Sequence, residues 1–312
     1  MVNSSFSRTI LQKGSTPTLK LDKLLKDYKT RVETAIDGSI PSMGGKTHLR
    51  DACEYALKNG GKRIRPIIVY MVGDALRNPI DVSPAALAIE FFHTASLVAD
   101  DLPCMDDDDE RRFKPSLHKV YGETLALLVS YGLIAAGYAC LSENAQLLKK
   151  SSALFAKESD SRCVLALENA TYNTGLFGAT GGQFLDVCPP DLTLPTLCEV
   201  IRKKTSSLFE ISFVLGWLFA GGSLDKIDAV KKVAAYFGMA FQIADDIADF
   251  AQDSANANSV NLACVLGMKE ASERFYVEID AYLRALEGVG LNTEALNALA
   301  AMLVSQVKVE KI

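Results

Sequence analysis

The sequence has few of the residues on which most protein metal centres and disulfide frameworks depend. Only three histidines occur, His48, His93 and His118, which excludes a histidine-rich metal site. The seven cysteines are scattered, odd in number and never form a Cys-x-x-Cys pair, a pattern typical of free thiols in a reducing cytoplasm. Positive charge is not in excess either. The 33 Lys and Arg against 38 Asp and Glu give a net charge of −5, so nucleic acid is not an expected partner.

The amino-terminal segment, residues 1–18, is polar and lacks the apolar centre of a signal peptide. We therefore expect it to be flexible and the protein to be cytoplasmic. Hydrophobic residues make up 49% of the chain, enough to bury a large core. Composition does not shift along the remainder, so residues 19–312 are predicted to form one domain.

One stretch requires a test for membrane insertion, because residues 124–142 carry no charge. The stretch contains two glycines and two tyrosines and lies between Glu123 and Glu143, whereas membrane helices are more uniformly apolar and have basic flanks. We predict a helix buried inside a bundle and no membrane span.

Helical periodicity dominates the chain. Leucines and other apolar residues recur every three or four positions over residues 21–36, and Ser83-Pro84 is a good start for a helix that runs to Ala99. Strand alternation is absent over any useful length. Further helices are expected over residues 46–59, 117–142, 145–157, 161–173, 196–222, 225–252 and 270–286. The sequence therefore predicts an all-α fold, a single large helical bundle.

Two clusters of aspartate carry the chemistry. The first follows an apolar helix and the second lies within one, where Asp245 and Asp249 are four residues apart and share a face. Buried carboxylates at this density repel one another unless cations lie between them, and Mg²⁺ with a substrate phosphate suits such oxygen ligands. The clusters comprise Asp100, Asp101, Asp106, Asp107, Asp108 and Asp109, and Asp245, Asp246 and Asp249.

A solvated acidic turn is the simpler interpretation for residues 107–109 taken alone. It fails for the second cluster, whose neighbours Phe241, Ile243, Ile247 and Phe250 are apolar. An EF-hand is excluded because neither cluster has glycine at the sixth position.

Three basic runs complement the carboxylates. They are Gly60 to Pro66 (GGKRIRP), Arg111-Arg112 with Lys114, and Lys203-Lys204-Thr205. Each run alone is typical of an exposed charged face. Together with the acidic clusters they indicate a diphosphate held by metal on one side and by Arg and Lys on the other.

These segments carry a resemblance to a known family. DDLPCMDDDDERR (residues 100–112) resembles the first aspartate-rich motif of the trans-isoprenyl diphosphate synthases, and DDIAD (residues 245–249) resembles their second. GGKRIRP, KPSLHKVYGE (114–123), GGQFLD (181–186), KKT (203–205) and FQ (241–242) match the family's other landmarks in order. The resemblance, over about residues 20–290, implies an all-α bundle around a deep central cavity, usually a homodimer. It also implies that isopentenyl diphosphate is condensed with an allylic diphosphate, namely dimethylallyl, geranyl or farnesyl diphosphate.

The resemblance also assigns roles to residues. Mg²⁺, three ions with the allylic diphosphate bound and replaceable by Mn²⁺, would be held by Asp100, Asp101, Asp106, Asp245 and Asp249, and Asp246 belongs to the same catalytic group. The allylic diphosphate would face Arg111, Lys204, Thr205 and Gln242, with Lys204 also catalytic. Isopentenyl diphosphate would be held by Lys62, Arg65, His93 and Arg112. Without the resemblance, His93 would be interpreted as a core histidine. Its place before Asp100, however, matches the family's ligand position.

Several positions depart from the family pattern. No lysine occurs between Asp249 and Lys269, where the family has one that reaches the allylic diphosphate, and Phe113 replaces a usual glycine. Ser116 replaces a usual threonine, and Tyr131-Gly132 a usual Gly-Asp. The affinity for the allylic diphosphate is expected to be weak, and Asn258→Lys is expected to increase it. A non-catalytic subunit of a heteromeric synthase and a terpene cyclase are the alternatives.

Product length is expected to depend on the helix before Asp100. Enzymes of the group that stop at farnesyl diphosphate have an aromatic residue five positions before this aspartate, where this chain has Ala95 beside Ser96. About one turn deeper, Phe92 and Phe91 would either close the end of the product cavity or be ordinary core residues. This pattern predicts geranylgeranyl diphosphate as product, with farnesyl diphosphate as the alternative.

Overall fold

The computed structural model describes residues 18–254 and 260–309, so residues 1–17 and Asn258 lie outside the described residues. The chain forms two compact units. We call Lys26–Glu168 with Leu218–Gly221 the N-terminal unit, and Asn169–Trp217 with Gly222–Ile312 and the described part of Met1–Leu25 the C-terminal unit. The prediction of one domain over residues 19–312 stays a prediction.

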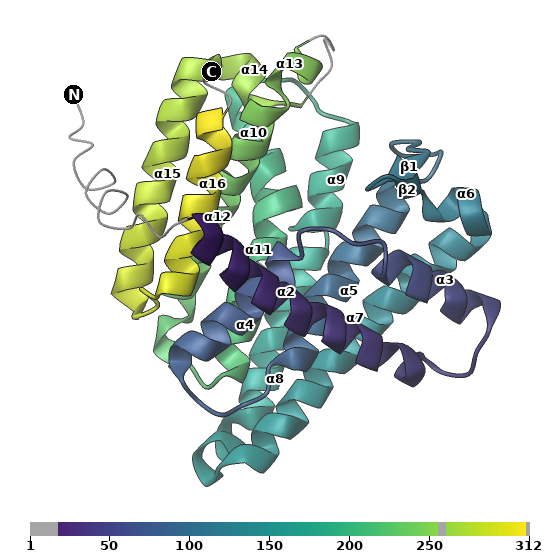
Figure 1. Ribbon diagram of the computed structural model, residues 1–312, viewed down its shortest axis with the longest axis vertical. Helices are drawn as coiled ribbons and strands as arrows, with labels where there is room; N and C mark the ends of the chain where they lie inside the picture. The colour runs from purple at the N-terminus through teal and green to yellow at the C-terminus, as the bar shows by residue number, and fades with distance from the viewer. Residues whose placement is uncertain (1–17, 255–259, 310–312) are drawn as a thin grey trace. The chain divides into compact units, whose positions relative to one another are not determined.

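The N-terminal unit is helical apart from one two-stranded hairpin (Figure 1). Helix α2 begins in the C-terminal unit, and the first part of α8 and the end of α11 belong to the N-terminal unit. Its elements are α2 (Thr18–Ser39), η1 (Ile40–Met43), α3 (His48–Leu57), α4 (Ile64–Leu76), α5 (Ser83–Asp100), β1 (Glu110–Arg111), β2 (Lys114–Pro115), α6 (Leu117–Tyr121), α7 (Glu123–Ser151) and α8 (Ala153–Thr174).

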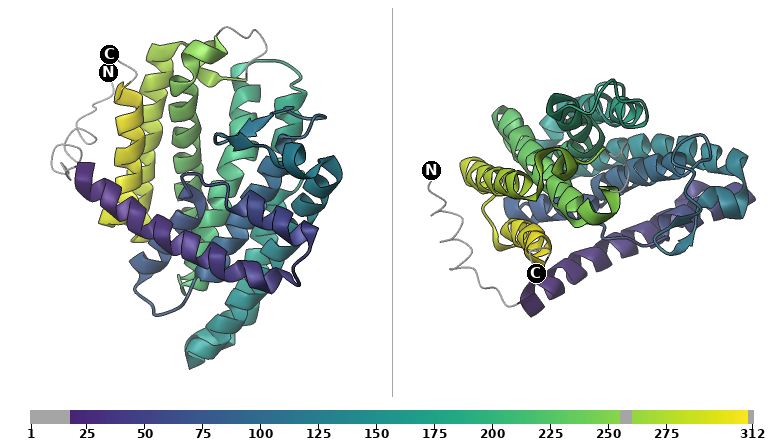
Figure 2. Two further views of the ribbon diagram at one scale, coloured as in Figure 1. Left: turned by 45° about the vertical axis from the view of Figure 1, so that its right-hand side comes forward. Right: turned by 90° about the horizontal axis from the view of Figure 1, so that it is seen from above.

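Helix α5 forms the centre of this unit because it is apolar on nearly every side and packs along α7 (Figure 2). The Ser83 amide donates to Asp81 Oδ1 at 2.9 Å, which fixes the turn before the helix, whose N-cap is Val82 and whose first residue is Ser83. Farther along, Ser130 of α7 donates to the Ala95 carbonyl at 3.0 Å, and the Phe92 ring covers Gly137. These contacts fix the helix that ends at Asp100.

The C-terminal unit is built from helices in its described part. Helix α12 packs against α15 and against a π-helical turn, η2 (Figure 2). Its elements beyond α8 are α9 (Ala179–Val187), α10 (Leu194–Val200), η2 (Ile201–Ser206), α11 (Ser207–Phe219), η3 (Leu224–Lys226), α12 (Ile227–Ala248), α13 (Phe250–Asp253), α14 (Leu262–Leu266), α15 (Met268–Val289) and α16 (Glu294–Val309).

The all-α prediction is confirmed, while several boundaries were wrong. The break expected near residue 144 is absent, because α7 continues to Ser151. Asn144 explains this continuity, since its side chain bonds the Ala85 amide and the Asp81 carbonyl and is fully buried. Helix α4 was not predicted, because nine of its thirteen residues are buried and it shows little one-sided periodicity.

Helix α7 is buried on one face only, so the expectation of a helix enclosed by the bundle was wrong. Val129, Leu133 and Leu141 are buried, whereas Leu127, Leu128, Tyr131 and Ile134 are 38–60% exposed. By length and composition alone α7 could cross a membrane, and 39% of its most apolar stretch is buried. The absence of a membrane span stays a prediction.

Candidate active site

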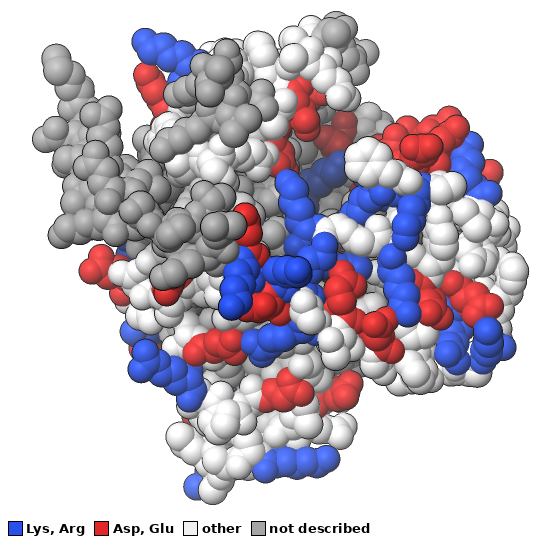
Figure 3. Space-filling model, viewed as in Figure 1, with Lys and Arg blue, Asp and Glu red and all other residues white. Residues whose placement is uncertain are grey.

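The first aspartate cluster follows α5 directly. The chain turns back after this helix, and the Asp106 amide donates to the Asp100 carbonyl at 2.9 Å. Asp100 is half-buried and Asp106 is exposed, whereas Asp101 is buried and accepts from Arg111 Nε at 2.8 Å. Figure 3 shows acidic side chains gathered over the β1–β2 hairpin with Lys and Arg beside them. The ion pair aims Arg111, and the role of Asp101 as a metal ligand stays a prediction.

The hairpin that follows turns through Arg112 and Phe113. Arg111 pairs with Lys114, so the loop has two residues, and both have positive φ, 58° and 64°. This is the geometry of a type I′ turn, which favours glycine or asparagine. Phe113 is 99% exposed and gains no packing. The position where the family usually has glycine is therefore a left-handed one in this chain.

The cations predicted to hold isopentenyl diphosphate meet near His93. Arg65 Nη1 lies 3.4 Å from His93 Nε2, and Arg112 donates to the Gly60 carbonyl, with its guanidinium against Gly61, where a Cβ would clash. Burial and then the charges of Arg65 and Arg112 hold the pKa of His93 well below its usual value. The imidazole is therefore neutral and can hydrogen-bond an anion. The fourth predicted residue, Lys62, has an exposed side chain.

Arg63, between Lys62 and Arg65, has a structural role that sequence reasoning missed. Its side chain is 1% exposed, and the guanidinium bonds Glu90 Oε1 at 2.5 Å, Glu33 Oε1 at 2.9 Å and the Leu57 carbonyl at 2.5 Å. Burial lowers the pKa of Arg63, but Glu90 and Glu33 outweigh it and raise the value above the ordinary one. This network joins α2, α5 and the N-cap of α4, and it fixes the start of α4, which contains Arg65 and follows Lys62.

The second aspartate cluster lies at the end of α12. Asp245 is half-buried and accepts from Gln306 at 2.9 Å, while Asp249 is exposed and caps the helix. Asp246 is buried and accepts from Gln242 at 2.8 Å and from the Leu262 amide at 2.9 Å. Burial raises the pKa of Asp246 to about 6, against the opposing effect of these hydrogen bonds. Asp246 therefore anchors the start of α14 at Leu262, a contact that supports a positioning role.

The allylic-site residues of the C-terminal unit form a connected group. Thr205 donates to Gln242 Oε1 at 2.7 Å, and Gln242 in turn donates to Asp246. Lys204 bonds Asp186 of α9 at 2.5 Å, another contact that the sequence did not predict. Both Lys204 and Thr205 belong to η2, and such π-helical turns occur frequently at functional sites.

The residues predicted to set product length have different surroundings in the structure. Ala95, Phe91 and Phe92 are all buried and Ser96 is half-buried. The Phe92 ring lies against Gly137 and 4.9 Å from the Tyr138 ring. Phe91, four residues before Ala95, lines a cavity of about 900 Å³ between α2, α5 and α7. Phe91 is therefore the side chain that borders open space.

Each unit thus contains some of the predicted site residues. The N-terminal unit brings together Asp100, Asp101, Arg111, Arg65 and His93, and the C-terminal unit brings together Lys204, Thr205, Gln242 and Asp246. The ligand roles assigned to the individual residues stay predictions.

Solved structures identify the fold class. The chain superimposes on a geranyltransferase from Legionella pneumophila with a TM-score of 0.79 and 28% identity, over 95% of this chain and 99% of that one. The fold is the all-α isoprenoid synthase fold, as the resemblance implied.

Sequence comparisons identify the family. The polyprenyl synthetase family model matches residues 46–261. A farnesyl diphosphate synthase from Geobacillus stearothermophilus is 33% identical over 89% of this chain and 95% of its own length. A heterodimeric geranylgeranyl pyrophosphate synthase large subunit 2 from Arabidopsis thaliana is 34% identical over 76% of this chain, which spans 61% of that protein. The chain belongs to the polyprenyl synthetase family, among its short-chain trans-isoprenyl diphosphate synthases.

Proposed function

We propose that this prenyltransferase condenses isopentenyl diphosphate with allylic diphosphates and releases geranylgeranyl diphosphate. The observation that carries the proposal is the pairing, in a member of this family, of two aspartate clusters with cations already oriented by hydrogen bonds. Family membership supports the chemistry, and the small side chains of Ala95 and Ser96 support the length.

The carboxylates fit a magnesium site. Asp100, Asp106, Asp245 and Asp249 are half-buried or exposed and offer hard oxygen ligands, which Mg²⁺ prefers. The two buried aspartates, Asp101 and Asp246, already accept hydrogen bonds from their own unit. The four accessible side chains would therefore hold the ions, three in the full complex. Bound Mg²⁺, which Mn²⁺ would replace, would neutralise charge on the leaving diphosphate.

The surrounding residues form two groups, one for each substrate. Arg111, Lys204 and Thr205 would bind the allylic diphosphate while its carbon–oxygen bond ionises. Arg65, His93 and Arg112, with Lys62, would hold isopentenyl diphosphate so that its double bond attacks the allylic carbon. The released diphosphate would then accept the proton that the new carbocation loses. The apolar wall formed by α5 would exclude water from the cationic carbon.

Product length is proposed to depend on Phe91. Ala95 leaves room for the growing chain, and Phe91 lies one turn deeper on the same face. Phe91 also lines the 900 Å³ cavity. A shorter side chain at this position would therefore let the growing isoprenoid product extend into that cavity.

The test is incubation of the purified protein with Mg²⁺, labelled isopentenyl diphosphate and each allylic primer in turn, followed by chromatography of the products. We expect geranylgeranyl diphosphate from wild type, farnesyl diphosphate from Ala95→Tyr and longer products from Phe91→Ala. Phe92→Ala is also expected to lengthen the product, but it empties the site over Gly137 and should lower stability by about 3–5 kcal/mol. No condensation with any primer would indicate a non-catalytic subunit, and farnesyl diphosphate from wild type would contradict the length assignment.

The protein is also proposed to act as a homodimer. The exposed apolar side chains of α7, together with Leu154, Val164 and Leu167 of α8, lie in one compact unit. Large exposed apolar patches are uncommon on monomeric proteins and typical of interfaces, so these side chains are proposed to line the dimer contact.

A further inference from the structure

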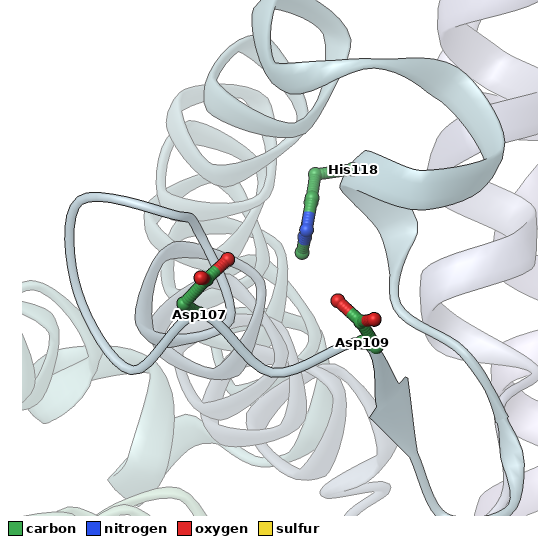
Figure 4. Close-up of side chains that lie close together, drawn as sticks. All are labelled: Asp107, Asp109 and His118. Atoms are coloured by element: carbon green, nitrogen blue, oxygen red, sulfur yellow. The ribbon is translucent and has the colours of Figure 1, made fainter.

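Three side chains near the hairpin could ligate a metal ion, although sequence reasoning interpreted two of them as part of a solvated turn. Asp107, Asp109 and His118 each place one ligand atom within 4.8 Å of the other two. Figure 4 shows the two carboxylates and the imidazole pointing toward one another. None of the three belongs to the residues expected to hold Mg²⁺.

His118 supplies an independent indication of a ligand. The residue is 93% buried, and neither ring nitrogen has a hydrogen-bond partner within the described residues. Most buried polar groups in proteins are satisfied, so an imidazole with two unsatisfied nitrogens requires an explanation. The imidazole is aimed at two exposed carboxylates, and a cation between them would satisfy it.

Backbone hydrogen bonds hold the three residues in place. The Ser116 amide donates to the Asp109 carbonyl at 2.9 Å, which places the start of α6, and with it His118, beside Asp109. The Asp107 amide donates to the Leu102 carbonyl at 3.2 Å, and Asp107 adopts φ of 51°, a left-handed conformation that aspartate tolerates better than most residues. Backbone hydrogen bonds therefore place the loop beside the helix, and the ion pair of Lys119 with Asp109 adds to them.

We propose that Asp107, Asp109 and His118 form a binding site for Zn²⁺, separate from the magnesium site. One imidazole nitrogen with two carboxylate oxygens suits Zn²⁺, whereas Mg²⁺ favours oxygen ligands alone. Bonds of about 2.0–2.2 Å place ligand atoms at most about 4.4 Å apart, so a small rotation of the exposed Asp107 side chain completes the site. Lys119 lies 2.6 Å from one oxygen of Asp109, and the carboxylate has a second oxygen for the ion.

The ion would tie the loop after α5 to α6. This loop contains Asp106, so zinc would order the segment that follows the first aspartate cluster without itself contacting substrate. The proposal goes beyond prenyl transfer and does not depend on it, because zinc binding can be measured with no isoprenoid present.

The test measures zinc binding to the full chain in excess Mg²⁺, which occupies the magnesium site. Wild type should bind one Zn²⁺, measured by calorimetry and elemental analysis, and Co²⁺ in its place should give the visible absorption of a nitrogen-containing site. His118→Asn should weaken zinc binding at least about 100-fold, since even groups that only support a ligand contribute 10–100-fold. His48→Asn, which removes an exposed histidine, should bind zinc as wild type does.

Absence of zinc binding by wild type in excess Mg²⁺, or equal binding by wild type and His118→Asn, would overturn the proposal. If His118→Asn does not fold, Asp107→Asn gives the same test at an exposed position, with the same expected loss. Unchanged zinc affinity in folded Asp107→Asn would also contradict it.

Discussion

Single residues show how this chain orients the cations that it is proposed to use. Arg111 is bonded by Asp101, Lys204 by Asp186 and Arg112 by the Gly60 carbonyl. Such bonds reduce the rotamer freedom that a long side chain would otherwise lose when it binds an anion. Arg63, which has a structural role only, is held by Glu90, a residue outside the recognised family motifs.

Phe113 provides a prediction at this scale. Phe113→Gly removes left-handed strain of about 1–2 kcal/mol, offset by about 0.5–1 kcal/mol for the greater freedom of glycine in the unfolded chain. The hairpin should gain roughly 0.5–1 kcal/mol, seen as a two- to fivefold slower amide exchange of residues 110–115. Phe113→Ala is the control, since it removes the ring but keeps the positive φ. Equal exchange in the glycine and alanine variants would show that strain is not stored here.

At the scale of elements, the π-helical turn η2 depends on the closeness of α9. A Cβ at Gly182 would lie 2.3 Å from the Lys204 backbone nitrogen, so the turn must move if residue 182 has a side chain. Gly182→Ala should therefore displace Lys204 from Asp186 and lower stability by about 1–3 kcal/mol. Since Lys204 is proposed to bind only the allylic diphosphate, KM for that substrate should rise.

Steady-state kinetics with each substrate varied in turn measures this effect. KM for isopentenyl diphosphate, whose proposed ligands lie in the N-terminal unit, should stay within error of wild type. Gly288→Ala on α15 has open space around the new Cβ and should leave both KM values unchanged. A rise in both KM values for Gly182→Ala would indicate a general disturbance and contradict the assignment of Lys204.

The elements also show what sequence reasoning can and cannot provide. The helices with one apolar face and the order of the charged motifs were predictable, because periodicity and motif spacing are local properties. Helix α4 was missed because it is apolar all round. Ser83 was expected to be the N-cap of α5, whereas it is the first helical residue and Val82 is the N-cap. The contact of Arg63 with Glu33 and Glu90 joins residues about thirty positions apart, and no local pattern separates this buried arginine from its neighbours Lys62 and Arg65.

At the scale of the whole molecule, the first question is assembly. Tyr131 is 60% exposed on the apolar face of α7. Tyr131→Lys would place a charge in the proposed interface and should convert the dimer to a monomer, measured by light scattering after size-exclusion chromatography. Val277→Lys is the control, because Val277 of α15 is 57% exposed but lies outside the proposed interface. A monomeric wild type, or a dimeric Tyr131→Lys variant, would contradict the proposal.

The second question is whether the two aspartate clusters, which belong to different compact units, act on one leaving group. The most direct measurement is kcat for Asp100→Ala, Asp245→Ala and the double variant, with Asp228→Ala, an exposed residue of α12, as control. Each single variant should lower kcat at least about 100-fold, the scale on which loss of a charge-stabilising group acts. The double variant should lose much less than the product of the two single losses, because both clusters serve the same diphosphate. Near-normal turnover by either single variant, full activity in excess EDTA, or strictly multiplicative losses would contradict the account.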